Sequence, residues 1–320
     1  MNYLITGGRG FIGCHVVRQL LCDGHTVLCT AHNLDKTSMH EVLTPEEVRR
    51  VEIVKADIGD TALMTQLMRE HKIDRVIHLA AVLGDVAERD PAEAVRVNLL
   101  GTISVFQACV DAGVKRVVWA SSQSAFGTEA FYRELYPNAA LVPNNAVLHP
   151  ALVYGETKVF AEFIADWFHQ KHGLETIGLR YCMVFGQARQ RGNGQFATEL
   201  INKPALGEKG TVQYGDTAPC WIYVEDAARA TVLATQCPDP TDRVFTIGGD
   251  IRSLADCLAY VRTLIPDADV TLLPGVFPAA FNLDVSEAER QLGFRCEYSV
   301  EQGIHETINL LRAEHGLPAV

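Results

Sequence analysis

Residues 6–13 read Thr6-Gly7-Gly8-Arg9-Gly10-Phe11-Ile12-Gly13, and they mark the joint between two predicted elements. Apolar residues before them predict a buried strand, and apolar residues at helical spacing predict a helix over Phe11–Cys22. Gly7 permits a tight turn, Gly10 lets the backbone approach a ligand, and Gly13 lets the helix pack on the strand. The N–H groups at the start of such a helix attract phosphates. This context predicts a dinucleotide-binding site; a glycine-rich turn without a ligand is the alternative.

Length and composition narrow the class of protein. The chain has 320 residues, of which 48% are hydrophobic, so one large α/β domain or one domain with a smaller cap is expected. The net charge is −11 and no basic stripe occurs, which argues against a nucleic-acid partner. No apolar run reaches the ~18 residues of a membrane span. The predicted first strand leaves no room for a signal peptide, so we expect a cytoplasmic protein without a membrane anchor.

Cysteine and histidine patterns argue against a metal site. The nine cysteines contain no C-x-x-C pair, and the eleven histidines form no H-E-x-x-H pattern. An odd number of scattered cysteines fits reduced thiols in a core better than disulfides or zinc ligands. We therefore expect no bound metal.

Strand-like and helix-like runs alternate along the first 182 residues. After the first strand, the predicted strands are Thr26–Thr30, Val51–Lys55, Arg75–Ala80, Arg116–Ser121 and Thr176–Tyr181, and the predicted helices are Phe11–Cys22, Thr61–His71, Pro91–Ala112 and Tyr154–His172. This alternation predicts an α/β fold with a doubly wound parallel sheet, the Rossmann fold. We assign residues 1–182 to this domain.

The pattern changes after residue 182. Residues 186–194 are polar and rich in Gln, Arg and Gly, which predicts a long loop. Shorter predicted elements follow, at Phe196–Asn202, Val212–Tyr214, Val224–Gln236, Val244–Ile247 and Leu254–Leu264. We expect residues 183–320 to form a smaller C-terminal α+β substrate-binding portion, with some segments returning to the Rossmann sheet. It would lie over the carboxyl ends of the strands, where ligands bind in such sheets.

A second motif, Tyr154-Gly155-Glu156-Thr157-Lys158, supplies a proton-transfer pair. Tyr154 and Lys158 are four residues apart on a predicted helix and share one face. The ammonium group is expected to lower the phenol pKa from ~10 and to bond a nicotinamide ribose. Tyr154 then exchanges a proton with an alcohol or ketone while a hydride moves to or from the nicotinamide ring. Ser122 ends a predicted strand, from which its hydroxyl reaches the reacting oxygen.

A pair of surface residues on a helix is the alternative interpretation of this motif. The chain order of glycine turn, Ser122, Tyr154 and Lys158 favours the catalytic interpretation. The Rossmann domain therefore also carries the predicted catalytic residues.

These residues resemble the extended short-chain dehydrogenase/reductase family, which contains nucleotide-sugar epimerases and dehydratases. The resemblance covers nearly the whole chain. The family's T-G-x-x-G-x-x-G matches residues 6–13, and its catalytic Tyr and Lys match Tyr154 and Lys158. The other matching segments are Asp57 with Ile58 for the adenine-binding acid, His78–Ala81, Asn98, Ser121–Gly127 with Phe126 in a tyrosine slot, Arg180–Met183 for R-Y-F-N, and Tyr223–Asp226 for Y-V-x-D.

The resemblance implies two sets of binding residues. Cofactor contacts are expected from Gly7, Gly10, Phe11, Ile12, Gly13, His32, Asp57, Ile58, Leu79, Ala80, Ala81, Asn98, Lys158 and Tyr181. Substrate contacts are expected from Gln123, Ser124, Met183, Arg189 and Arg191.

The chain departs from the sugar dehydratases and from the UDP-sugar epimerases of this family. Dehydratases carry Asp-Glu after the catalytic Ser or Thr, but Gln123 and Ser124 stand here, and an amide cannot act as an acid. UDP-sugar epimerases hold the diphosphate with an Asn and two Arg, and those slots contain Met183, Pro219 and Leu273. Each charge-assisted hydrogen bond contributes ~1.5–3 kcal/mol. Their loss argues against a nucleotide sugar, unless arginines of the 186–194 loop substitute.

The cofactor is expected to be NAD or NADP. An Asp at the end of the second strand commonly binds the adenosine ribose and repels a 2′-phosphate. This chain reads Cys29-Thr30-Ala31-His32-Asn33 there, without an acid. The pattern is similar to the T-x-R-N of NADP-dependent plant reductases, with His32 in the Arg slot. The pattern weakly favours NADP. An equally supported interpretation is that His32 is a solvent-exposed loop residue without a role in cofactor binding.

We expect an NAD(P)-dependent oxidoreductase that interconverts a secondary alcohol and a ketone on a small sugar-like or polyol-like substrate. The alternative is an NAD-dependent sugar or nucleotide-sugar epimerase, which oxidises a hydroxyl, rotates the ketone and reduces its other face. A non-catalytic dinucleotide-sensing protein is a third interpretation, disfavoured by the Tyr154–Lys158 pair. By analogy with the family, helices Pro91–Ala112 and Tyr154–His172 pack against their copies in a homodimer.

Overall fold

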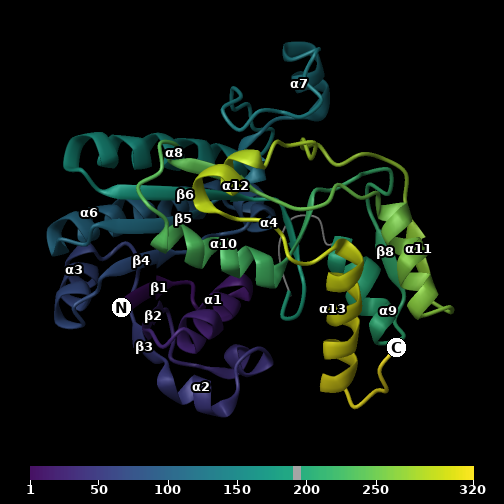
Figure 1. The fold of residues 1–320 in the computed structure, drawn as a ribbon, viewed down its shortest axis with the longest axis horizontal. Helices are drawn as coiled ribbons and strands as arrows, with labels where there is room; N and C mark the ends of the chain where they lie inside the picture. The colour runs from purple at the N-terminus through teal and green to yellow at the C-terminus, as the bar shows by residue number, and fades with distance from the viewer. Residues whose placement is uncertain (190–195) are drawn as a thin grey trace.

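A seven-stranded parallel sheet forms the centre of the molecule (Figure 1). The computed structural model describes residues 1–189 and 196–320. In spatial order the strands are β10 (Val244–Ile247), β6 (Glu175–Tyr181), β5 (Arg116–Ser122), β4 (Arg75–His78), β1 (Asn2–Thr6), β2 (Thr26–Ala31) and β3 (Glu52–Lys55). The strand order reverses between β1 and β4, which is where doubly wound sheets bind ligands. The predicted fold class is confirmed.

Helices cover both faces of this sheet (Figure 1). On β1, Leu4 packs with the buried residues of α3 (Thr61–Glu70), α6 (Thr102–Ala112) and α8 (Val153–His172). Its neighbours Tyr3 and Ile5 pack instead with α1 (Phe11–Cys22) and α10 (Val224–Gln236). Because consecutive side chains of a strand point to opposite faces, one apolar strand contributes to two cores.

Elements from the C-terminal half also lie within this layered unit. Strand β10 pairs with β6 at the edge of the sheet, and α10 packs beside α1. Glu225, near the start of α10, bonds His15 Nδ1 at 2.5 Å and also pairs with Arg18 of α1. These bonds fix the helix that follows the glycine turn. The division of the chain at residue 182 stays a prediction.

The remaining C-terminal elements form a smaller α+β portion (Figure 1). They comprise β7 (Met183–Phe185), η4 (Thr198–Asn202), α9 (Lys203–Ala205), β8 (Gly210–Val212), β9 (Trp221–Tyr223), α11 (Leu254–Leu264), β11 (Val270–Leu272) and α13 (Val300–Glu314). Helix α12 (Ser286–Leu292) instead packs on β10 and α10 of the layered unit. Strand β7 pairs with β9, and β8 pairs with β11. The strand predicted over Val212–Tyr214 ends earlier because Tyr214 has a φ of +58° and lies in a turn.

The helix predicted over Pro91–Ala112 is continuous but not regular. It comprises α5 (Pro91–Ala94), a π-helical segment η2 (Val95–Gly101) and α6. A Cβ on Gly101 would approach Ile58 Cδ1 to 2.6 Å, so any larger residue would force the Ile58 side chain to move. π-Helical turns are common at functional sites. Here the turn contains Asn98, one of the predicted cofactor residues.

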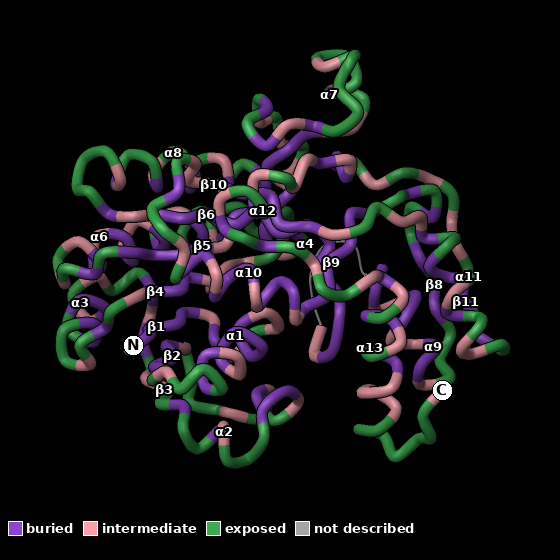
Figure 2. The backbone as a smooth tube through the Cα atoms, in the orientation of Figure 1, coloured by how far each residue is buried: buried purple, intermediate pink, exposed green. Residues whose placement is uncertain are grey.

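Helix α7 (Glu129–Leu135) projects from the body of the molecule, and the segment that follows it returns to the sheet (Figures 1 and 2). On the return path, the Val142 N–H donates to the Asn282 carbonyl at 2.7 Å. The Asn144 side chain donates to the Val244 carbonyl at 2.9 Å and accepts from the Thr246 N–H at 2.9 Å. The return segment is therefore anchored, and the tip of the projection is exposed.

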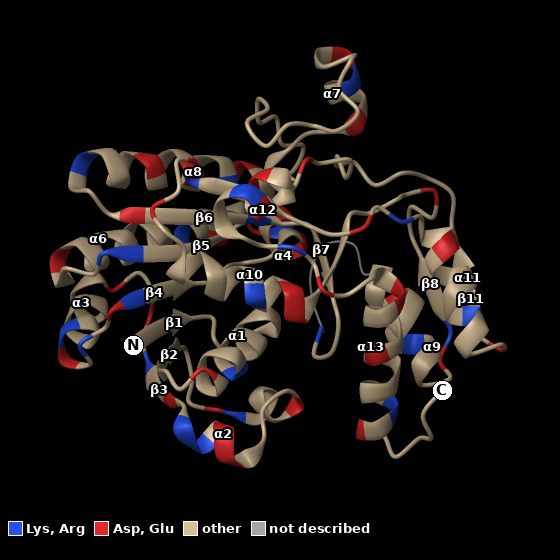
Figure 3. Cartoon of the chain, in the orientation of Figure 1, with Lys and Arg blue, Asp and Glu red and all other residues tan. Residues whose placement is uncertain are grey.

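Four further short helices connect these elements. They are η1 (Thr37–Glu41), α2 (Pro45–Arg50), α4 (Gly84–Arg89) and η3 (Gln123–Ala125). Basic and acidic side chains are interspersed over the helices (Figure 3). Within residues 1–189 and 196–320, no helix is both long and apolar enough to cross a membrane. All nine cysteines are free thiols, and six of them are buried.

Candidate active site

The turn between β1 and α1 is shaped for close approach of a ligand. Gly7 has a φ of +73°, and a Cβ there would lie 2.7 Å from the Ala80 backbone nitrogen. A Cβ on Gly13 would lie 2.2 Å from the Gly7 carbonyl oxygen. Helix α1 begins at Phe11 without a side-chain cap, which leaves its first N–H groups available to phosphate oxygens. The turn fits the pyrophosphate of a dinucleotide.

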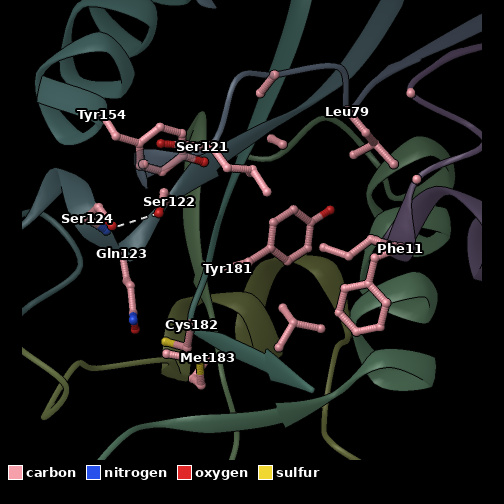
Figure 4. A pocket seen from close by; sticks show the side chains of 18 of the residues that line it. Phe11, Leu79, Ser121, Ser122, Gln123, Ser124, Tyr154, Tyr181, Cys182 and Met183 are labelled. Carbon is pink, nitrogen blue, oxygen red and sulfur yellow. Dashed lines mark hydrogen bonds between the residues drawn. The ribbon is translucent and has the colours of Figure 1, made fainter. Parts of the chain in front are cut away.

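A cavity of about 330 Å³ opens beside this turn and extends to Tyr154 (Figure 4). Its lining includes these predicted residues: Gly7, Gly10, Phe11, Ile12, Gly13, Leu79, Ala80, Ala81, Ser122, Gln123, Ser124, Tyr154, Tyr181, Met183 and Arg189. The structure therefore brings the glycine turn, the proton-transfer tyrosine and most predicted substrate contacts around one space.

Other predicted residues lie outside the cavity lining. Asn98 bonds the backbone of Val82 through both ends of its amide, at 2.8 and 3.0 Å, so it shapes the loop after β4. Ile58 packs against Gly101, and the exposed His32 follows the end of β2. Arg191 lies outside the described residues.

Asp57 follows β3 and also lies outside the cavity. Its carboxylate accepts from the Gly59 N–H at 2.8 Å and pairs with Arg96 at 3.3 Å. The hydrogen bond from Gly59 and the charges of Arg96 and His32 lower the pKa of Asp57. The predicted adenine-binding acid is thus ionised and held by its own loop.

Ser122, Tyr154 and Lys158 converge at the carboxyl end of β5. Tyr154 lies in the first turn of α8, and Ser122 hydrogen-bonds its hydroxyl. A Cβ on Gly155 would lie 2.1 Å from the Ser124 carbonyl oxygen, so only glycine lets α8 start this close to η3. Lys158 Nζ lies 5.4 Å from the Tyr154 ring centroid and donates to the Ala120 carbonyl at 2.7 Å. The motif therefore builds a compact proton-transfer group.

Protonation in this group differs from the sequence prediction. Burial raises the pKa of Tyr154 to about 12, although the hydrogen bond with Ser122 acts to lower it. Burial also lowers the pKa of Lys158 to about 8, against the opposing charge of Glu162. The prediction that Lys158 lowers the Tyr154 pKa is wrong, because desolvation of the buried phenol dominates and raises it.

The substrate side of the cavity has a mostly neutral wall. Gln123 is only 6% exposed, and its amide oxygen has no hydrogen-bond partner in the described structure. Arg189 donates to the Val184 carbonyl, and its guanidinium lies 5.7 Å from the Phe11 ring centroid. Burial lowers the pKa of Arg189 to about 10, so it remains a cation at neutral pH.

Three residues, Met183, Pro219 and Leu273, stand where UDP-sugar epimerases are expected to have diphosphate-binding residues, and not all three lie at the cavity. Met183 lines the cavity as predicted, whereas neither Pro219 nor Leu273 is part of its lining. The Leu273 carbonyl instead accepts from the Gly215 N–H at 2.6 Å. Of these three residues, the structure therefore places only Met183 at the candidate site.

Seven lining residues were missed by the sequence analysis. They are Leu83, Gly84, Ala120, Ser121, Cys182, Val184 and Phe277. Most of them flank a matched motif, so proximity in the sequence was a usable signal. Phe277 comes from a loop between β11 and α12, and no local pattern links that loop to the cavity.

Comparison with known proteins supports this picture. The NAD dependent epimerase/dehydratase family matches residues 3–248. The chain is similar to the UDP-glucuronate 4-epimerase of Thermodesulfobacterium geofontis, with 27% identity over 325 residues that cover 96% of this chain and 95% of that protein.

Two crystal structures show the same fold. The UDP-glucose 4-epimerase of Thermotoga maritima with UDP-glucose has a TM-score of 0.84 and 26% identity, covering 98% of this chain and 100% of that one. The UDP-glucose 4-epimerase of Thermus thermophilus in complex with NAD has a TM-score of 0.81 and 25% identity, covering 98% of this chain and 99% of that one.

Proposed function

Because the chain belongs to the NAD dependent epimerase/dehydratase family, we propose that it is an NAD-dependent nucleotide-sugar 4-epimerase. It is an enzyme of the short-chain dehydrogenase/reductase superfamily, as the sequence predicted. The observation that carries the proposal is the single cavity shared by the glycine turn, Ser122 and Tyr154. The expected small-polyol oxidoreductase finds no support among the three relatives named above, which are nucleotide-sugar epimerases.

Each residue of the proton-transfer group has a distinct part in such a reaction. NAD, when bound, accepts a hydride from the sugar carbon and later returns it. Tyr154 takes the proton of the reacting hydroxyl and gives it back to the ketone. Ser122 holds the reacting oxygen by a hydrogen bond, and Lys158 supplies positive charge near the phenol.

We propose NAD, not NADP, as the cofactor. Solved structures similar to this chain contain NAD, and they give no support to the lean towards NADP. Asp57 and Glu93 interact electrostatically with His32, although hydrogen bonds from Gly59 and Arg96 respectively are the main causes that lower their pKa values. Both carboxylates pair with the single guanidinium of Arg96, so the net charge of this group is negative and disfavours a 2′-phosphate.

The direct test is conversion of nucleotide sugars. The purified protein is incubated with NAD and, separately, with UDP-glucose, UDP-galactose, UDP-glucuronate and UDP-N-acetylglucosamine, and the sugars are followed by proton NMR. We expect one of them to give its 4-epimer without net change in nicotinamide absorbance. Absence of conversion and of binding for all four would contradict the proposal.

Oxidation of a small polyol is the second candidate, and one observation favours it. Met183 lines the cavity at the position where UDP-sugar epimerases have a residue that binds the diphosphate, and its side chain is uncharged. Net reduction of NAD by a sugar or polyol, without turnover of any nucleotide sugar, would select this candidate.

We also propose that the protein is a homodimer formed through α8. Phe160, Phe163 and Trp167 of this helix are 44%, 66% and 43% exposed. Leu100 and Val95 of the neighbouring η2 are 56% and 43% exposed. Large apolar side chains gathered on two adjacent helices suit a second copy of the same surface.

A further inference from the structure

Lys158 is a buried cation on the face of α8 that packs against the sheet. The residue is 4% exposed, and its Nζ atom donates to the Ala120 carbonyl of β5 at 2.7 Å. A carbonyl oxygen satisfies one of the three N–H donors of an ammonium group but carries no full negative charge. Burial disfavours the charged form of a lysine, so the groups around Lys158 decide whether it stays a cation.

Glu162 lies one turn further along the same face of α8. Side chains four residues apart on a helix are neighbours, with Cβ atoms about 5–6 Å apart. Like Lys158, Glu162 is buried, with 8% exposure. Its carboxylate accepts from Ser121 Oγ at 2.6 Å and from Arg180 Nε at 2.8 Å. Because Ser121 follows Ala120 in β5, consecutive residues of one strand hold consecutive turns of α8 and fix this carboxylate one turn from the ammonium group.

The other groups around Lys158 supply no buried negative charge. These groups are Tyr154 on α8, His78 on β4, Glu88 on α4, and Arg180 and Tyr181 on β6. His78 is neutral near pH 7, because burial and the charge of Lys158 lower its pKa to about 3. Glu88 is exposed to solvent. Among the residues that the structure describes, the only buried carboxylate besides Glu162 is Asp226, which belongs to α10 on the opposite face of the sheet.

We propose that Glu162 is a positioning residue of the proton-transfer group, whose fixed carboxylate keeps the Lys158 ammonium group charged beside Tyr154. This inference rests on the proposed function, in which that positive charge acts on the phenol. Burial lowers the pKa of Lys158 to about 8, and the charge of Glu162 acts in the opposite direction. Without the carboxylate, Lys158 would lose its proton at a lower pH, and Tyr154 would lose the neighbouring charge with it. Glu162 does not line the cavity, so it acts through Lys158 and not on a substrate.

The charge of Lys158 can be measured without turnover. The full-length protein is labelled with lysine that carries ¹³C at Cε, and its Lys158 signal, identified by its loss in Lys158→Met, is followed by NMR from about pH 6 to about pH 10. In Glu162→Gln we expect the pH of half-protonation to fall by about one pH unit or more, because the opposite charge is gone. Asp166→Asn removes an exposed carboxylate from the same helix and is the matched control, which should leave that pH unchanged.

Two further variants separate the effect of the charge from damage to the fold. Arg180→Gln breaks the same ion pair but keeps the carboxylate, so the half-protonation pH of Lys158 should not fall. The double variant with Glu162→Gln and Arg180→Gln leaves no unpaired guanidinium, so it provides the test if Glu162→Gln alone does not fold. In the double variant we expect the half-protonation pH of Lys158 to fall as it does in Glu162→Gln.

A pH profile connects this charge to the reaction. The turnover number of the parent protein and of Glu162→Gln, or of the double variant, is measured with NAD and a nucleotide sugar over the same pH range. We expect activity to decline at a lower pH in the variant, by about the same shift as the Lys158 signal shows. A lower activity with an unchanged pH dependence would show a structural role only, and would overturn the inference.

The outcomes separate this inference from the proposed function. If the half-protonation pH of Lys158 is unchanged without Glu162, or if Arg180→Gln lowers it as much as Glu162→Gln does, the inference is overturned and the proposed function stands. If that pH falls as expected but the parent protein converts no nucleotide sugar, the proposed function fails, while the effect of Glu162 on the charge of Lys158 is confirmed.

Discussion

Tyr154 and Lys158 are shifted in opposite directions by the same cause, which is burial. The phenol pKa rises to about 12 and the ammonium pKa falls to about 8, so the phenol is neutral at pH 7. A neutral phenol is ready to donate a proton to a ketone. To accept a proton from an alcohol, Tyr154 needs additional positive charge nearby, because such charge lowers the phenol pKa.

Removing the Tyr154 hydroxyl tests its assigned role directly. In Tyr154→Phe we expect the turnover number to fall by at least about 100-fold, because general acid–base catalysis contributes that much or more. The affinity for NAD should stay within a few-fold, since the ring is retained. Steady-state kinetics and NAD titration measure the two effects. Tyr260→Phe on α11 is the control, and an equal loss in both variants would refute the assignment.

His78 gives the molecule a sensitivity to acid. Its ring is buried on β4 and bonds the hydroxyls of Thr6 at 2.6 Å and Thr102 at 3.0 Å. Burial, together with the charge of Lys158, lowers the pKa of His78 to about 3. Between pH 6.5 and 3 the unfolded chain binds a proton that the folded chain does not, so stability is lost as the pH falls through this range.

We expect His78→Gln to lose less stability on acidification than the parent protein. From pH 7 to pH 4.5 the difference should be about 2–3 kcal/mol, because each pKa unit corresponds to about 1.4 kcal/mol. Urea unfolding at both pH values measures it, with exposed His172→Gln as the control. Equal losses in His78→Gln and the parent would show that His78 is not the acid-sensitive group.

At the level of elements, a buried ion pair joins α8 to the sheet. Glu162 of α8 accepts from Arg180 Nε and Nη2 of β6 at 2.8 and 2.6 Å, and from Ser121 Oγ of β5 at 2.6 Å. The Arg180 and Glu162 side chains are 7% and 8% exposed. The bonds fix the helix that carries the proton-transfer group.

Breaking this pair should be costly, because it leaves a cation buried without its partner. For Glu162→Gln we expect a loss of about 3–5 kcal/mol in the free energy of unfolding. Glu129→Gln removes the exposed partner of Arg133 on α7 and should cost less than about 1 kcal/mol. Denaturant unfolding of both variants measures these free energies. Equal losses of stability in the two variants would contradict a stabilising role for the buried Arg180–Glu162 pair.

The bounds of several helices could be predicted from the apolar spacing and the residues at their ends. The ranges Phe11–Cys22, Val224–Gln236 and Leu254–Leu264 are helices in the structure, with the same bounds. Helix α13 was missed, although Ser299 and Gln302 form a capping box at its start. The π-helical segment η2 could not be predicted, because a local apolar pattern does not distinguish it from an α-helix.

The candidate site was predictable where residues follow motifs along the chain. Ser122, Gln123 and Tyr154 line one cavity because each follows or begins a recognisable element. The direction of the Tyr154 pKa shift was not predictable, because it depends on how deeply the folded chain buries the phenol. Phe277 was also beyond prediction, since only tertiary structure brings its loop to the cavity.

At the level of the whole molecule, the apolar face of α8 predicts assembly. A charge in the centre of such a face must be desolvated when two copies associate. We therefore expect Phe163→Glu to convert a dimer into a monomer, as measured by analytical ultracentrifugation. Leu141→Glu, at the exposed tip beyond α7, is the control and should leave the mass unchanged. A parent protein that already sediments as a monomer would contradict the proposed dimer.

The projecting α7 region also determines how the chain behaves when it is cut. A protease that cleaves near the exposed Leu141 would sever the backbone in front of the anchors at Val142 and Asn144. The two fragments would stay together through the shared sheet and separate only in denaturant. Nicked protein would thus elute like intact protein from a sizing column and show two bands on a denaturing gel.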